Sequence, residues 1–168
     1  AMGFLTRILD EATCHCRERL VGGKALHNYD QVQARLALIQ SAFTICSAMC
    51  VNTSERASID RDLATHGLEA NAIKTCVTDL MQDAAQSLLQ LVGAAGYRLD
   101  HFAGRAIVDS RPFQIFEGSN DILYIQIAEA LFKQMKAARE KNLFRYLNSF
   151  DLTHRASGLI KKLIGFDL

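Results

Sequence analysis

The sequence predicts an all-α protein, an antiparallel four-helix bundle with a short helical C-terminal extension. Apolar residues recur at spacings of three and four through most of the 168 residues, and proline occurs only once. No segment shows a convincing alternation of apolar and polar residues with the period of two that a strand requires. Amphipathic helices of this length bury their apolar faces by packing side by side as a bundle.

Four segments carry the apolar stripe of a bundle helix. They are Leu5–Leu20, Tyr29–Cys50, Ile73–Leu91 and Ser119–Arg139. The glycines at Gly22–Gly23 are expected to end the first helix, and Gly93 with Gly96 the third. The second helix should bury a narrow seam of apolar side chains. This seam consists of Tyr29, Val32, Leu36, Ile39, Phe43 and Cys46. The apolar start of the fourth helix, Ile122–Ile125, is expected to lie buried between neighbours.

The sequence suggests a division into a bundle, residues 1–139, and a tail, residues 140–168. The apolar residues of the tail are Phe144, Leu147, Phe150, Leu159, Ile160, Leu163 and Ile164. The last four are expected on a short helix. A segment of this size cannot fold alone, so we expect it to dock on the bundle or on a partner subunit.

Composition argues against several classes of function. The chain has 19 basic and 18 acidic residues, a net charge of +1, so no basic face for nucleic acid is indicated. We expect no apolar stretch to approach the roughly 18–20 residues that cross a bilayer, and therefore no membrane span. The first residues also lack the basic start and long apolar run of a signal peptide.

The cysteines are expected to be reduced and to lie in the core. They are Cys14, Cys16, Cys46, Cys50 and Cys76. An odd number without a regular framework is typical of intracellular proteins, so we expect a cytoplasmic protein, or a mitochondrial matrix protein in a eukaryote. Cys14 and Cys16 would point to different helix faces, and no second ligand pair stands at zinc spacing, so no metal site is expected.

The segment with the most chemical information is Gln114–Ile122, with the sequence QIFEGSNDI. Glu117 is a lone carboxylate in an apolar run, and Gly118 after it would let a ligand approach the backbone. A carboxylate at the mouth of a helix is a candidate general base, since apolar neighbours can raise a carboxyl pKa toward the working range. The alternative is structural, because a negative charge at a helix N-terminus complements the dipole.

Four segments resemble motifs of the acyl-CoA dehydrogenase family, in the family's order and spacing. Leu9–Lys24 resembles the opening helix and its E-R-x-x-F-G-K ending, and Tyr29–Ala37 resembles F-Q-x-V-Q-x-x-L-A. Gln90–Tyr97 resembles Q-x-x-G-G-x-G-Y, and Asp109–Ile122 resembles D-A-R…I-Y-E-G-T-N-E-I. The resemblance covers residues 3 to about 131 and corresponds to the family's carboxy-terminal domain, a four-helix bundle.

This resemblance implies a reaction. Glu117 would remove the α-proton of an acyl-CoA thioester while FAD accepts a hydride from the β-carbon, which gives a trans-2-enoyl-CoA in fatty acid metabolism. Some members of the family place the base just before the first helix of this domain, a segment that this sequence does not contain. By resemblance, much of both pockets belongs to two further domains, so the 168-residue chain alone is expected to be inactive.

The resemblance also implies a set of cofactor contacts. Arg19 would contact the FAD pyrophosphate of a neighbouring subunit, as a guanidinium with forked donors can. Gln90, Gly93 and Ala94 match positions that lie against the dinucleotide, and Ser119 matches a threonine that touches the flavin. The structural alternatives are a solvated cation at a helix end for Arg19 and a helix N-cap for Ser119.

Three departures from the family pattern weaken the cofactor contacts more than the base. Gly22 stands where the family has phenylalanine, Asp30 where it has glutamine, and Val108 where it has arginine. These departures and the extra tail leave open a second function, a non-catalytic helical module for assembly or regulation. By resemblance the chain forms a homo-oligomer, a dimer or tetramer. The acyl chain length, the electron acceptor, and the choice between dehydrogenase, oxidase and monooxygenase stay open.

Overall fold

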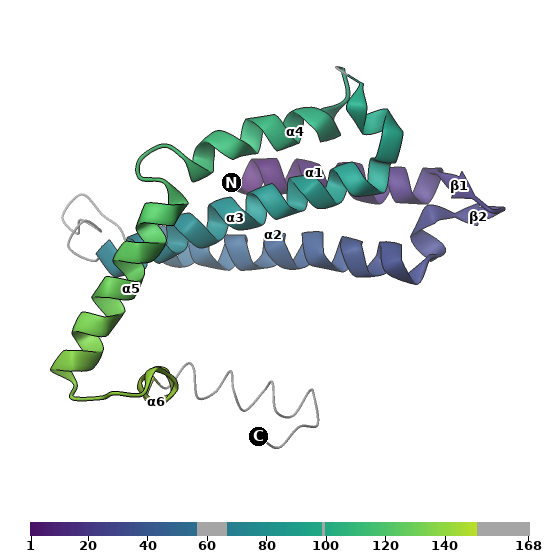
Figure 1. Ribbon diagram of the computed structural model, residues 1–168. Coiled ribbons are helices and arrows are strands. Elements are labelled where there is room, and N and C mark those ends of the chain that lie inside the picture. The colour runs from purple at the N-terminus through teal and green to yellow at the C-terminus, as the bar shows by residue number, and fades with distance from the viewer. Residues whose placement is uncertain (57–66, 99, 151–168) are drawn as a thin grey trace. The chain divides into compact units, whose positions relative to one another are not determined.

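The computed structural model describes residues 1–56, 67–98 and 100–150 of the chain (Figure 1). The α-helices are α1 (Met2–Glu18), α2 (Asp30–Arg56), α3 (Gly67–Val92), α4 (Phe102–Ser110), α5 (Asn120–Ala137) and α6 (Leu143–Asn148). The short 3-10 helices are η1 (Leu26–Asn28), η3 (Gly93–Tyr97) and η4 (Arg111–Gln114). In this part of the chain, β1 (Leu20–Val21) and β2 (Lys24–Ala25) pair as an antiparallel hairpin. The chain divides into two compact units, Ala1–Tyr124 and Ile125–Leu168.

The first unit is an antiparallel helical bundle, which confirms the predicted fold class. α1 and α3 run in one direction, and α2 and α4 run back along them (Figure 1). Each of α1, α2 and α3 packs against the other two, and α4 packs on α3. The side chains that fill the centre include Leu5, Ile8, Ile39, Leu88 and Ala106, all fully buried.

The predicted seam of α2 faces this core. Val32, Ile39 and Cys46 are buried. The other three residues of the seam are half-buried and pack against the core; they are Tyr29, Leu36 and Phe43. The spacing of three and four therefore identified the correct face of the longest described helix.

A tight hairpin connects α1 to α2. Gly22 and Gly23 form its turn with φ of 57° and 82°, a backbone conformation that favours glycine. The Tyr29 hydroxyl donates to the carbonyl of Val21 at 2.7 Å, and a Cβ at Gly22 would lie 3.0 Å from that hydroxyl. The expectation that the first helix includes Leu20 is wrong, because α1 ends before it and Leu20 lies in β1, 65% exposed.

Helix α4 was missed by the sequence prediction. It has nine residues, too few turns for a spacing pattern to be distinctive. It begins at an N-cap formed by His101, whose Nδ1 accepts the backbone N–H of Ala103 at 3.1 Å. At its other end the Ser110 hydroxyl donates to the side-chain oxygen Oε1 of Gln82 at 2.9 Å, which fixes α4 to α3 through a buried polar contact.

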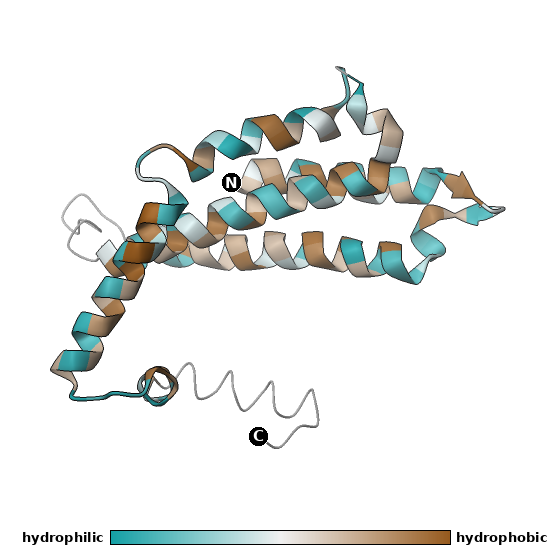
Figure 2. Ribbon diagram, viewed as in Figure 1, coloured by the Kyte–Doolittle hydropathy of each residue, from teal (hydrophilic) through white to brown (hydrophobic). Residues whose placement is uncertain are grey.

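The start of α5 is more exposed than expected. Leu123 is buried, but Ile122, Tyr124 and Ile125 are 54%, 48% and 60% exposed. Figure 2 shows this apolar first part of α5 in brown. The expectation of burial between neighbours is therefore wrong, because the apolar pattern predicts that a partner is needed and does not say that this chain supplies it.

Helix α2 passes the length and composition test for a membrane-spanning helix. Over its 27 residues, an 18-residue window reaches a mean hydropathy of 1.5, and Figure 2 shows pale and brown residues along most of the helix. The expectation that no stretch approaches this length is wrong, because Gln40, Ser41 and Thr44 interrupt the apolar run without adding charge. In the structure one face of α2 packs against α1 and α3.

The second unit contains the rest of α5 and α6. Met135 is buried, and the Tyr146 hydroxyl donates to the side-chain carbonyl of Gln134 at 3.2 Å. Tyr146 and Phe150 make an edge contact with their ring centres 5.3 Å apart. The expected tail helix with Leu159 and Leu163 lies outside the described residues, and docking of the tail stays a prediction.

The cysteines are distributed more widely than predicted. Cys16 and Cys46 are buried, Cys50 and Cys76 are half-buried, and Cys14 is exposed. Burial is the main cause that raises the pKa of Cys46 to about 11. The expectation of a core position is wrong for Cys14, which lies two residues from the buried stripe of α1.

Two glycines bring η3 and α4 into close contact. A Cβ at Gly104 would lie 2.3 Å from the carbonyl oxygen of Gly96, and a Cβ at Gly96 would lie 3.4 Å from the Cβ of Ala103. The first of these distances is too short for any side chain, and the opposing atom is backbone. Gly104 is therefore required for α4 to reach its position on the bundle.

Replacing Gly104 by alanine should destabilise the bundle. The added methyl group must displace backbone, so we expect a loss of about 1–3 kcal/mol in the free energy of unfolding, measured by urea denaturation. Gly3→Ala is the matched control, because a Cβ there meets nothing within 4 Å and alanine favours the helix. Equal stability of the two variants would contradict the close contact.

Candidate functional site

Glu117 lies in the loop between η4 and α5, and its backbone is in the left-handed region. Its φ is 55°, and that of Gly118 is 93°. For a residue with a Cβ this conformation costs of order 1–3 kcal/mol and persists only where surrounding contacts hold it. The carboxylate is exposed and makes no hydrogen bond or ion pair with the described residues. The loop therefore presents an unpaired acid in a strained conformation.

Lys74 on α3 holds the loop directly. Its Nζ donates to the carbonyl oxygen of Gly118 at 2.8 Å and to Oδ1 of Asn120 at 2.7 Å. Lys74 is half-buried, so these are charge-assisted bonds from a side chain with restricted motion. The carbonyl group of Gly118, the residue after Glu117, is thus fixed to α3.

Asp79, just over one turn further along α3, binds both flanks of the same loop. Its Oδ1 accepts from Nε2 of Gln114 at 2.6 Å and from Nδ2 of Asn120 at 2.6 Å. Asn120 is buried, and its Nδ2 also donates to the Thr78 hydroxyl at 2.9 Å. One carboxylate therefore connects the residue three positions before Glu117 with the residue three positions after it.

Tyr124 completes this network. Its hydroxyl donates to Oδ2 of Asp79, and this hydrogen bond is the main cause that raises the pKa of Tyr124 to about 12. The negative charge of Asp79 and partial burial act in the same direction. The second turn of α5 is thereby attached to α3 through a polar side chain.

The expected apolar surroundings of Glu117 are not complete in this chain. Ile115 and Phe116 are 56% and 47% exposed, so they flank the acid without enclosing it. The rings of Phe113 and Phe116 contact each other at 5.6 Å between centres. A closed apolar site around Glu117 would need further surface from outside the described residues.

The predicted cofactor residues lie at the opposite end of the bundle, with the exception of Ser119. Arg19 is the C-cap of α1, and Gln90 lies in the last turn of α3 (Figure 1). Both side chains are exposed and make no hydrogen bond with the described residues. Gly93 has a φ of 65° with open space where a Cβ would lie, and Ala94 after it is exposed.

The six predicted site residues therefore form two separate groups. Lys74, which binds the loop of Glu117, and Gln90 are sixteen positions apart on α3, a separation of about 24 Å at 1.5 Å per residue. Ser119 lies beside Glu117, and its carbonyl accepts the N–H of Leu123 at 3.0 Å, as the residue before a helix does. One copy of this chain cannot place both groups on a single small ligand.

Lys74 and Asp79 bind the loop of the candidate site, and the sequence did not predict them. Lys74 directly follows Ile73, and Asp79 directly precedes Leu80. Ile73 and Leu80 pack against the core, so Lys74 and Asp79 lie at its edge. A charged side chain at the edge of a core usually has a polar partner there, so the place of Lys74 and Asp79 in the sequence could have indicated their role. Asn120 belongs to the sequence motif around Glu117, but no role was predicted for its side chain.

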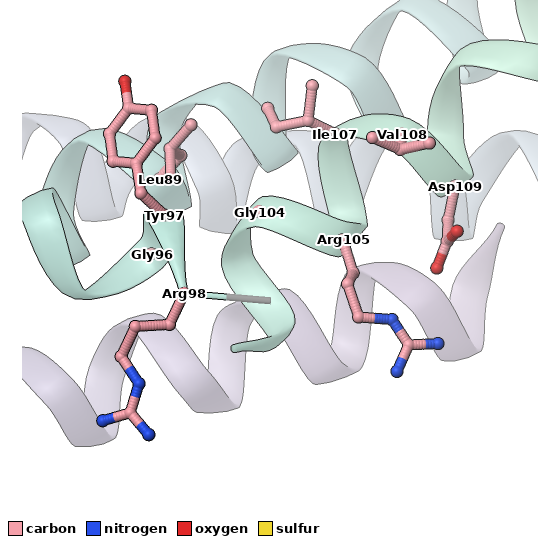
Figure 3. Close-up of a pocket in the computed structure, with 9 residues that line it drawn as sticks. All are labelled: Leu89, Gly96, Tyr97, Arg98, Gly104, Arg105, Ile107, Val108 and Asp109. Atoms are coloured by element: carbon pink, nitrogen blue, oxygen red, sulfur yellow. The ribbon is translucent and has the colours of Figure 1, made fainter. Parts of the chain in front are cut away.

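Away from the Glu117 loop, a hollow lies between η3 and α4, with a volume of about 470 Å³. Figure 3 shows that Arg98 and Arg105 point away from Tyr97 and Ile107 on its border. Arg98 forms a 2.8 Å ion pair with the exposed Asp100. The hollow contains none of the predicted site residues, and its charged groups do not converge on one point.

Comparison with known proteins gives a consistent family match. The family model described as "Acyl-CoA dehydrogenase, C-terminal domain" matches residues 1–132. The mitochondrial very long-chain specific acyl-CoA dehydrogenase of Mus musculus is 27% identical over 126 residues, 75% of this chain and 19% of that relative. A probable acyl-CoA dehydrogenase of Mycobacterium bovis, fadE25, is 28% identical over 133 residues, 79% of this chain and 34% of the relative.

A likeness to solved structures supports the same fold. The structure titled "FAD complex of PigA" superposes with a TM-score of 0.70 at 22% identity, and covers 77% of this chain and 33% of that one. The chain thus spans about a fifth to a third of the length of the proteins it matches.

Tyr124→Phe should remove the phenol whose pKa is raised to about 12, mainly by its hydrogen bond to Asp79. The pKa is about 12 in the folded chain against 10.0 ordinarily, so the stability gained from this bond is fully present below about pH 10. It should be lost as the pH rises from about 10 to about 12. We expect the parent to gain an ultraviolet phenolate signal in that window that Tyr124→Phe lacks.

Tyr97→Phe is the control variant, because it removes an exposed phenol, and the difference that Tyr124→Phe makes should be the same in the parent and in the Tyr97→Phe background. The same gain of phenolate signal between about pH 10 and about pH 12 in the parent and in Tyr124→Phe would contradict the bond to Asp79.

Proposed function

This chain belongs to the acyl-CoA dehydrogenase family, in which it represents the C-terminal domain, and from that premise we propose that it supplies the catalytic base and part of the flavin site of an FAD-dependent acyl-CoA dehydrogenase. The complete enzyme would need further domains, since the chain spans only about a fifth to a third of its relatives. The electron acceptor and the acyl chain length stay open.

The proposed reaction is α,β-dehydrogenation of an acyl-CoA thioester. Glu117 takes the α-proton onto a carboxylate oxygen, and the product is the trans-2-enoyl-CoA. FAD, when bound, accepts the hydride that leaves the β-carbon. The chain's share is to hold the base at one fixed position, which removes much of the entropy cost of the encounter.

The observation that carries this proposal is the state of Glu117. It is an exposed carboxylate, unpaired among the described residues, in a left-handed backbone conformation that α3 holds through Lys74 and Asp79. A helix-dipole role needs neither the strained φ nor this network, because any carboxylate in the first turn of α5 would serve. Strain that the surroundings maintain is a common feature of functional sites.

The residues at the other end of the bundle fit a dinucleotide. The guanidinium of Arg19 is exposed and unpaired among the described residues, so its donors are available to pyrophosphate oxygens. Beside Gly93 there is open space at the backbone. Gln90, three positions earlier in the last turn of α3, has an exposed side-chain amide. Ala94 already carries a Cβ, so close approach of a ligand to the backbone is more restricted there.

Because the two groups are separated along α3, we infer that each flavin site uses two copies of the chain. One copy would hold the dinucleotide with Arg19 and Gln90, and the other would offer Ser119 and Glu117 to the flavin ring. The exposed apolar side chains of Ile122 and Ile125 support self-association. A homo-oligomer, dimer or tetramer, is therefore part of the proposal.

No specific observation favours the alternative of a non-catalytic assembly or regulatory module. An oxidase or monooxygenase of the same family would use the same base and cofactor positions, so the site residues do not distinguish them. The mouse relative is mitochondrial by its name, and a matrix or cytoplasmic location is proposed for this chain.

The 168-residue chain alone should be colourless and inactive, while a longer chain that contains it should bind FAD. The reason is that Glu117 and Arg19 lie on open surface here, and a flavin would lose little contact with water by binding to either. The absorbance spectrum of each purified protein checks this. Stoichiometric flavin on the short chain would contradict the need for further domains.

Glu117→Gln in the FAD-binding chain should keep flavin and acyl-CoA binding but slow flavin reduction by more than ~10²-fold, the low end for loss of a general base. Glutamine preserves the shape and cannot accept the proton. Anaerobic mixing with an acyl-CoA, followed at the flavin absorbance, measures the rate. Glu129→Gln on the exposed side of α5 is the control and should react normally. Normal reduction by Glu117→Gln would mean that the base lies on another segment.

A further inference from the structure

We propose that Asp79 is a positioning residue for Glu117, which it holds in the reactive geometry by binding both flanks of its loop. This inference rests on the proposed function, because it gives Asp79 a role in the reaction only through Glu117. The carboxylate of Asp79 does not reach the reacting atoms itself. It accepts hydrogen bonds from the segments that enter and leave the loop.

The contacts of Asp79 are symmetric about Glu117. Gln114 lies three residues before it and Asn120 three residues after it, and both donate to Oδ1 of Asp79 at 2.6 Å. Tyr124 donates to Oδ2 from the next turn of α5. Since all three donors meet one carboxylate, the two ends of the loop cannot move apart without breaking a charge-assisted bond.

Asp79 lies on a rigid part of the bundle. Asp79 is half-buried on α3, and its neighbours Val77 and Thr78 are buried in the bundle. α3 contacts α1, α2 and α4, so it is the most extensively packed described helix. A side chain on such a helix defines a position better than contacts made within the loop could.

The contacts of Asp79 maintain the left-handed backbone conformation of Glu117. With φ at 55°, the Cα–Cβ bond of Glu117 points in a direction that the ordinary negative φ would not give. If the flanks were released, the strained residue would relax and the carboxylate would turn away from its present direction. Lys74 alone would then hold only one side of the loop, at Gly118 and Asn120.

The first test uses the 168-residue chain and a protease that cleaves after glutamate. Asp79→Ala should increase cleavage after Glu117 roughly tenfold or more, because local opening of the loop becomes frequent. Asp83→Ala is the matched control, an exposed carboxylate four residues further along α3. It should leave the cleavage rate unchanged. Equal rates for Asp79→Ala, Asp83→Ala and the parent would overturn the proposal.

If Asp79→Ala fails to fold, every glutamate becomes susceptible and Asp79→Asn decides the question. This variant keeps the side-chain shape and one carbonyl acceptor but loses the charge. Cleavage after Glu117 should increase while cleavage after Glu11, inside α1, and the thermal unfolding midpoint stay at the parent values. Asp79→Asn that behaves like Asp83→Asn would overturn the proposal.

The second test measures flavin reduction in the longer FAD-binding chain. Asp79→Ala, or Asp79→Asn in its place, should slow reduction by roughly tenfold and change acyl-CoA binding little. In the double variant with Glu117→Gln, the Asp79 substitution should cause no further loss, since residues that act through one group are not additive. An equal loss in the presence and absence of Glu117 would overturn the positioning role.

These tests separate this inference from the proposed function. If Glu117→Gln alone reduces its flavin normally, the assignment of the base fails, and the proteolysis result still reports whether Asp79 orders the loop. If Glu117→Gln is inactive but Asp79→Ala and Asp83→Ala react alike, the base stands and the role of Asp79 is refuted.

Discussion

The loop that carries Glu117 depends on the carboxylate of Asp79 on α3. Gln114, Asn120 and Tyr124 all donate to it, so the end of η4 and the first two turns of α5 are attached to the same point. The bundle below provides the rigid element, since α3 packs against α1, α2 and α4. The strained backbone of Glu117 is compatible with this arrangement because tertiary contacts, rather than local preference, determine it.

The chain presents its two groups of candidate residues on open surface. Glu117 and Arg19 are both exposed. Arg19 is the C-cap of α1 and Glu117 lies just before α5, and Figure 1 shows the end of α1 and the start of α5 at opposite ends of the bundle. A buried reaction centre requires exclusion of water, which neither group achieves by itself. This is the physical reason to regard the domain as one part of a larger assembly, and the exposed apolar turns of α5 agree with it.

The helical fold could be predicted from periodicity, and the site only in part. Val32, Ile39 and Cys46 appear in the expected seam because one face of a long helix repeats every three or four residues. The bond from Asn120 to Asp79 joins residues 41 positions apart, and no local pattern encodes such a pair. Likewise, the apolar residues after Asn120 predict a need for burial but not which surface satisfies it. Motifs therefore located Glu117, and only tertiary structure reveals what holds it.

The most direct measurement is a crystal structure of the longer chain with FAD and an unreactive acyl-CoA thioester bound. The account predicts a carboxylate oxygen of Glu117 within roughly 3.5 Å of the substrate α-carbon, the range of a near-attack geometry. It also predicts that Asp79 still accepts from Gln114 and Asn120 in that complex. A Glu117 side chain that remains in solvent, with another carboxylate at the α-carbon, would contradict the account.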